Sequence, residues 1–169
     1  MTHSKPIDPQ PRSSAERSEN HPPLAQIPRG EYAYPGPLRD SLVEAIIEGT
    51  KTSTSCLLAE FEPERNPLTD LEALEAVVDS HDNIVCVTCI IDVRITRLGD
   101  ITDQHAIAEG EGYTDAQHWR REHERFWRSP EYVSDMGLVD LTDDTPVVCY
   151  SFKIDRRYPV RKPVPWDKS

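Results

Sequence analysis

The chain of 169 residues is long enough for one domain with a hydrophobic core, and its formal net charge is −11. The negative charge lies in the middle: residues 29–154 carry about −14, the first 28 residues carry no net charge, and those from Asp155 onward carry +3. Proteins that grip long nucleic acids normally present a basic field, because phosphate neutralisation supplies most of the affinity. The charge therefore favours a small ligand, or a nucleic acid that is held only locally.

Both ends of the chain are rich in proline. Residues 1–28 contain six prolines and no apolar run of the length that a secretory signal needs, so we predict a disordered N-terminal tail. Residues 156–169 are predicted to form a proline-rich, basic C-terminal tail, which leaves residues 29–155 as the folded domain. No segment approaches the length of a membrane span, so we expect no membrane partner.

The first predicted element is a helix over residues 37–48. Pro37 suits the first helical position, apolar residues from Leu38 to Ile46 form one stripe, and Gly49 is expected to end the helix.

Strands are predicted at residues 55–62, 77–78, 84–97 and 145–154. Residues 66–72 are predicted to be a turn or short helix, with Thr69 and Glu72 spaced as a capping box, and residues 81–83 to be a tight turn. Several strands with few helices between them indicate an antiparallel or mixed sheet that curls into a barrel.

A second helical region is predicted between the last two strands, over residues 100–127. It consists of a short helix, an acidic glycine loop and a long helix that Thr114 and Gln117 would cap. The long helix has a buried stripe, which is formed by Ala116, Trp119, His123, Phe126 and Trp127. A histidine on such a stripe is more often a hydrogen-bonded core residue than a ligand.

The four cysteines include a C-x-x-C pair, Cys86 and Cys89. This pair falls within the long predicted strand, where residues three apart project to opposite faces and cannot hold one metal ion. We therefore expect buried free thiols, no metal, no cofactor and no disulfide. Such thiols indicate a reducing compartment, so a cytoplasmic location is expected.

A lysine lies among hydroxyl residues in "EGTKTSTS", residues 48–55. In one interpretation Lys51 is a solvated charge that complements the dipole at the C-terminus of the helix. In the other, a neutral Lys51 activates the hydroxyl of Thr54, and a glutamate of the loop "EGEG", residues 109–112, carries a proton. The residues alone favour the first interpretation.

Three motifs resemble the ASCH domain family, a branch of the PUA-like β-barrels. Gly49, Lys51, Thr52 and Thr54 match its G-x-K-T-x-T element in order. The segment "AIAEGEGYTDAQHWRREHERFW" looks like the EGEG…W-x-x-x-H-x-x-F signature of the longer bacterial ASCH proteins, and "DTPVVCYSF" resembles their closing strand. The resemblance covers about residues 31–155. It implies an α+β fold, a PUA-like (ASCH) β-barrel with flanking helices.

The resemblance also implies an activity, because short ASCH members are amidohydrolases that deacetylate 4-acetylcytidine. Carried over to this chain, Thr54 would attack the acetyl carbonyl, Lys51 would act as the base, and Glu109 would protonate the departing amine. Further substrate-binding residues are expected at Thr52, Ser53, Glu111 and Tyr150. The implied partner is a nucleoside or modified base, without a cofactor or metal; the sequence makes no prediction about the oligomeric state.

Two alternatives remain open. PUA-like domains generally bind RNA, and some longer bacterial ASCH members resemble ribonucleases, so the chain could be a ribonuclease or an RNA-binding module. The basic residues for this role are the C-terminal tail and four arginines of the long helix: Arg120, Arg121, Arg125 and Arg128. The second alternative is a non-catalytic ligand-binding regulatory domain. Tyr150 favours it, because the family's closing strand often has glutamate there.

Overall fold

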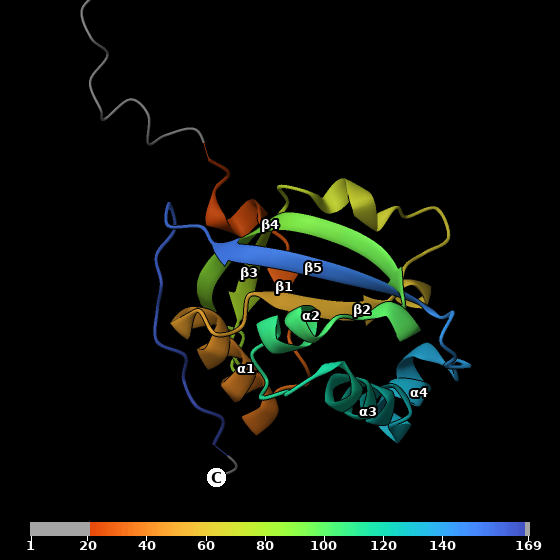
Figure 1. The fold of residues 1–169 in the computed structure, drawn as a ribbon. Coiled ribbons are helices and arrows are strands. Elements are labelled where there is room, and N and C mark those ends of the chain that lie inside the picture. Colours follow the sequence, from red (N-terminus) through yellow and green to blue (C-terminus); the bar gives the residue numbers. More distant parts are fainter. Residues whose placement is uncertain (1–20, 168–169) are drawn as a thin grey trace, which may run out of the picture.

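A mixed five-stranded sheet forms the centre of the molecule and curves strongly along its length (Figure 1). The structure is a computed structural model that describes residues 21–167. The strands lie in the order β1-β3-β4-β5-β2; β1 pairs with β3 in parallel, and the other neighbours are antiparallel. Their bounds are Arg29–Gly30 (β1), Ser53–Leu57 (β2), Leu74–Val78 (β3), Ile84–Arg97 (β4) and Pro146–Ile154 (β5). The mixed sheet that was expected from the sequence is therefore present.

The first long strand differs from its prediction. β2 begins at Ser53 rather than Ser55, because Ser53 pairs with Ser151 of β5, and it ends at Leu57. The chain then turns into a short 3-10 helix, η3 (Leu58–Glu60), where the sequence had suggested more strand. β4 occupies the predicted residues, and the shorter 3-10 helices η2, η4 and η5 cover Leu24–Gln26, Pro67–Asp70 and Leu98–Asp100.

Helices lie beside the sheet in two groups. α1 (Pro37–Glu48) stands apart from α2 (Asp103–Ala108), α3 (Ala116–Trp127) and α4 (Pro130–Met136), which gather near β2 (Figure 1). Gly49 ends α1 in a left-handed conformation with φ 83°, as predicted.

The two predicted capping boxes are wrong. Asp115, not Thr114, caps α3: its carboxylate accepts a hydrogen bond from the backbone N–H of His118 at 2.7 Å. Asn66, not Thr69, caps η4 in the same way, by accepting from the N–H of Leu68. In both cases an Asp or Asn occupies the residue at which the backbone enters the helix, and its side-chain oxygen accepts from a free N–H group of the first turn.

Two hydrophobic clusters hold these helix groups separately. Trp119 and Trp127 of α3 pack with Leu57, Val147 and Cys149 of β2 and β5. On the other side, Val43 and Ile46 of α1 pack with Val77, Cys86 and Phe152 of β3, β4 and β5. The candidate site described below lies where the end of α1 meets the α2–α3 loop.

The folded part extends beyond the predicted limits at both ends. Ile27, which was assigned to the tail, is buried with Ala76, Val87 and Tyr158. The hydroxyl of Tyr158 donates to the carbonyl of Pro22 at 2.7 Å, so the two terminal segments contact each other. Composition missed this packing because a few buried residues are sufficient to hold a proline-rich segment. The part of the predicted tail in residues 1–20 lies outside the described residues.

All four cysteines are free thiols. Cys86 and Cys89 both lie in β4, where strand geometry directs them to opposite faces, as the sequence predicted. None of the helices within residues 21–167 has the length and hydrophobicity of a membrane span.

Replacing Tyr158 by alanine tests whether the terminal segments belong to the domain. Tyr158→Ala removes a buried ring from the cluster around Ile27, and we expect it to lower the free energy of unfolding by about 3 kcal/mol in urea denaturation. Tyr158→Phe removes only the hydrogen bond to Pro22 and should cost about 1 kcal/mol. Unchanged stability of Tyr158→Ala would show that the ends do not pack on the sheet.

Candidate functional site

The turn after α1 brings Lys51 against the α2–α3 loop. The backbone N–H groups of Thr50 and Lys51 both donate to the carbonyl of Ala45, and these bonds close the end of the helix. The next N–H, from Thr52, donates to the carbonyl of Ala108 at the end of α2. Segments about 58 residues apart are thereby held side by side.

Lys51 is buried, with 2% of its side chain exposed. Its Nζ donates to the carbonyls of Ser53 at 3.0 Å and Glu109 at 3.1 Å, and it lies 4.0 Å from Oε2 of Glu111. The ring of Tyr32 lies 5.9 Å from the same nitrogen. These contacts stabilise an ammonium, and they rule out the interpretation of Lys51 as a solvated charge at the end of the helix.

Gly110 permits the close approach of the loop to Lys51. Its φ is +67°, and a Cβ at this position would lie only 2.6 Å from the Cα and N of Lys51. No other residue type combines this conformation with this contact. Glu109 and Glu111, on either side of Gly110, are thereby placed next to the ammonium.

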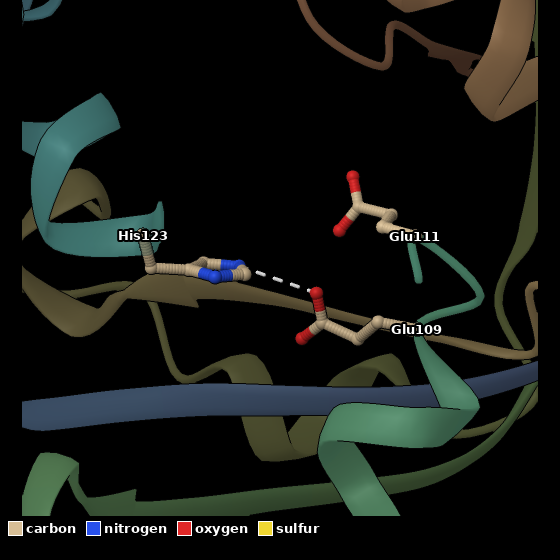
Figure 2. A group of neighbouring side chains, drawn as sticks. All are labelled: Glu109, Glu111 and His123. Carbon is tan, nitrogen blue, oxygen red and sulfur yellow. Dashed lines mark ion pairs between the residues drawn. The ribbon is translucent and has the colours of Figure 1, made fainter. Parts of the chain in front are cut away.

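Glu109 is the most enclosed acid of the site, with 1% of its side chain exposed. Its Oε1 accepts from the hydroxyl of Ser55 at 2.6 Å and lies 2.9 Å from Nε2 of His105, while Oε2 lies 3.2 Å from Nε2 of His123 (Figure 2). Burial alone would raise the pKa of Glu109, but the hydrogen bonds from His105 and His123 hold it well below its usual value. Glu109 is therefore a carboxylate.

The pKa of Glu111 is shifted in the opposite direction. Burial raises the pKa of Glu111, and this effect, together with the nearby charge of Glu109, outweighs the opposing influence of Lys51. Tyr113 hydrogen-bonds to Glu111, and burial and that carboxylate raise the pKa of the phenol, which therefore stays a proton donor. Of the two glutamates, Glu111 is therefore the one whose pKa lies above its usual value.

His105 anchors Glu109 from α2. Burial disfavours its charged form, but hydrogen bonds to Cys149 and Glu109 raise the pKa of His105 to about 9. His123 is fixed from α3: its Nδ1 lies 3.0 Å from the carbonyl of Trp119, and its ring stacks on Trp119 with centroids 4.0 Å apart. The expectation of a hydrogen-bonded core histidine was therefore correct for His123, but the residue also contacts the site.

A pocket of about 310 Å³ opens beside Glu111, between α1 and α3. Its volume lies at the lower end of the range of ligand sites, which suits a small molecule. Lys51 and Glu109 do not line the pocket; they lie behind the residues that do. The lining residues are Leu38, Ser41, Leu42, Gly110, Glu111, Tyr113, His118 and Glu122.

Glu109, Glu111 and His123 also offer three metal-ligand atoms within 4.8 Å of one another. A divalent cation there would compete with the Lys51 ammonium, which the same carboxylates already face, and would displace the His123–Glu109 contact. The cluster fits a hydrogen-bonded network better than a metal centre.

The structure brings some of the predicted site residues together and separates others. Lys51, Glu109 and Glu111 converge. Thr54 follows Ser53 in β2, so its side chain projects to the face opposite Ser53 and Ser55, and within residues 21–167 its hydroxyl makes no hydrogen bond.

The remaining three predicted residues lie outside the acidic cluster. Thr52 is exposed and its hydroxyl donates to the carbonyl of Ala108. Ser53 is buried and its hydroxyl lies 3.3 Å from that of Ser151. Tyr150 pairs with Thr54, and its hydroxyl donates to Asp70 at 2.8 Å.

Three residues of the network were not predicted as site residues: Ser55, His105 and His123. His105 and Glu109 are four apart on one helix, a spacing that places them on the same face and could have indicated the pair. Ser55 could not be chosen among the hydroxyls without the register of β2.

A family model described as ASCH domain matches residues 31–155, most of the chain. The chain belongs to the ASCH domain family. Two solved structures share the fold of this ASCH domain, and in each comparison 76% of this chain is covered. One is an ASCH domain from Lactobacillus crispatus JV V101, with TM-score 0.65, 17% identity and 79% of that chain covered. The other is protein EF3133 from Enterococcus faecalis V583, with TM-score 0.63, 22% identity and 80% covered.

The search among curated protein sequences gave no match. At these low identities the two solved structures show the fold alone. They confirm the α+β, PUA-like (ASCH) fold class with flanking helices that the motifs implied.

Gly110→Ala tests whether the contact between the loop and Lys51 shapes the site. The added methyl meets the backbone of Lys51 in a left-handed conformation, so we expect the free energy of unfolding to fall by at least about 2 kcal/mol. Gly112→Ala is the matched control: its φ is +84°, but nothing lies within 4 Å, so only about 1 kcal/mol should be lost. Equal effects in urea denaturation would contradict the close approach.

The pKa of His105 predicts how stability depends on pH. The folded-state pKa of about 9 exceeds the ordinary value of 6.5, so the stabilisation is complete below pH 6.5 and is lost as the pH rises through about 9. We expect the stability difference between wild type and His105→Gln to shrink between pH 6.5 and 9.5 in chemical denaturation. A difference that stays constant over this range would show that His105 is neutral in the folded state.

Proposed function

We propose that this ASCH domain binds a nucleoside or modified base in the pocket between α1 and α3 and hydrolyses an amide on its exocyclic amine, as in 4-acetylcytidine. One observation carries the proposal: Glu111, a carboxyl with a raised pKa, lies on the pocket wall with the buried Lys51 ammonium behind it. A proton-exchanging acid at the edge of a nucleoside-sized cavity suits general acid–base catalysis.

In the proposed reaction, Glu111 takes a proton from a water molecule as the water oxygen bonds to the acetyl carbon. The tetrahedral intermediate collapses when the bond from carbon to the exocyclic nitrogen breaks. Glu111 returns the proton to that nitrogen, and the free amine leaves together with acetic acid, which loses its remaining proton to solvent as acetate. Lys51 stabilises the carboxylate form of Glu111 at the start of the cycle, and Tyr113 holds the carboxyl in place.

The contacts support this division of roles over the one carried over from the family resemblance. A base at Lys51 would have to be neutral, whereas its Nζ donates to two carbonyls beside a carboxylate. Glu109 has a lowered pKa and does not line the pocket, so it suits the positioning of Lys51 and the histidines rather than proton donation. Thr54 lies on the other face of β2 from Ser55, which contacts Glu109.

The RNA alternative gains little from α3. Arg120 and Arg128 both pair with Glu124, and Arg120 also pairs with Asp143. These partners cancel much of the basic charge that a phosphate backbone would need. A non-catalytic ligand-binding domain uses the same pocket, and turnover measurements separate it from the proposed enzyme.

Kinetics on 4-acetylcytidine test the proposal. Glu111→Gln keeps the shape of the side chain but cannot carry a proton, so kcat/KM should fall by about 10²–10⁴-fold. Thr54→Val should stay within about tenfold of wild type, because water is the nucleophile. Lys51→Met should lose activity and also stability, since it leaves two buried carbonyls without their donor.

Three results would contradict the proposal in different ways. Loss of activity in Thr54→Val with Glu111→Gln unaffected would support a covalent threonine route. Absence of turnover with tight nucleoside binding would indicate a non-catalytic domain. Cleavage of labelled RNA without nucleoside binding would favour a ribonuclease.

A further inference from the structure

Within residues 21–167, the pocket lining carries two acids and no permanently charged base. Glu111 comes from the α2–α3 loop and Glu122 from α3, and the lining within the described residues includes neither lysine nor arginine. Burial and the charges of Glu111 and Glu122 raise the pKa of the Tyr113 hydroxyl, and all three residues line the pocket. A ligand that enters the pocket therefore passes two carboxyl groups.

The Lys51 ammonium behind the pocket is not available to a ligand. Lys51 is buried, and its ammonium is already directed at the carbonyls of Ser53 and Glu109 and at the carboxyl of Glu111. Arg125 pairs with Glu122 at 3.4 Å, but 78% of its side chain is exposed, so solvent screens this pair and leaves much of the Glu122 charge in place.

The N-terminus of α3, a common place for phosphate to bind, is also occupied. The Asp115 carboxylate accepts the hydrogen bond from the N–H of His118, and this bond lowers the pKa of Asp115. The positive end of the helix dipole beside the pocket is thereby neutralised by the chain itself.

We propose that Glu122 is a specificity-determining residue that excludes phosphate, so that the pocket accepts a nucleoside or base and rejects the corresponding nucleotide. The inference rests on the proposed function and extends it to the charge class of the ligand. Repulsion between a phosphate dianion and a half-exposed carboxylate at the mouth is expected to weaken binding by about tenfold at low salt.

Binding of cytidine and cytidine 5′-monophosphate, measured by titration calorimetry at low salt, tests the inference on the full chain. Neither molecule carries an acyl group, so binding is measured without turnover. We expect wild type to bind cytidine about tenfold more tightly than the nucleotide, and Glu122→Gln to reduce this ratio by at least about threefold. Raising the ionic strength should also reduce the preference of wild type for cytidine over the nucleotide, because salt screens the repulsion.

Glu64→Gln is the matched control, because it makes the same charge change at an exposed position of the loop between η3 and η4, away from the pocket lining. The ratio of its affinities for cytidine and for the nucleotide should equal the ratio of wild type.

The outcomes separate the inference from the function on which it rests. Equal affinity for cytidine and the nucleotide in wild type, or a ratio that Glu122→Gln leaves unchanged, would overturn the role of Glu122 and leave nucleoside binding intact. Binding of neither molecule by wild type would overturn the proposed function and this inference with it.

Discussion

The buried ammonium of Lys51 is the constraint on which the site depends. A charge removed from water is tolerated only when hydrogen bonds and opposite charge replace its hydration. Here the replacements come from two segments: the carbonyl of Ser53 at the start of β2, and the carbonyl of Glu109 and the carboxyl of Glu111 in the α2–α3 loop. The lysine therefore ties the loop to the sheet, and Gly110 lets the two backbones approach closely enough for this to happen.

Two glutamates that face the same ammonium differ in the direction of their pKa shifts. Glu109 faces inward to two histidines and Ser55, which together fix it as a carboxylate. Glu111 faces the pocket, where burial and the charge of Glu109 favour its protonated form. Two acids whose pKa values are pushed apart in this way are the pattern expected where one supports the site and the other moves a proton.

Much of the framework could be predicted from the sequence, because strong local signals fixed it. Pro37 and Gly49 mark the ends of α1, and the apolar run of β4 is long enough to be recognised as a strand. The site could be predicted only in part. Lys51 and the EGEG loop carry a recognisable motif, whereas the choice between Thr54 and Ser55 depends on which face of β2 each occupies, and the pairing with β5 decides that.

The other differences between the predictions and the structure also have local causes. The sequence could not show that Asp115 rather than Thr114 caps α3, because the point at which the backbone leaves the loop decides which side chain reaches the N–H of His118. Nor could composition show that Ile27 and Tyr158, from opposite ends of the folded part, pack in one buried cluster.

The division between the two glutamates is the central claim, and carbon-13 NMR titration of the side-chain carboxyl groups tests it most directly. In the full-length protein, the Glu111 carboxyl should titrate above its ordinary value near 4.5, while the Glu109 carboxyl remains ionised below that value. The reverse order, with Glu109 titrating high and Glu111 low, would contradict the account.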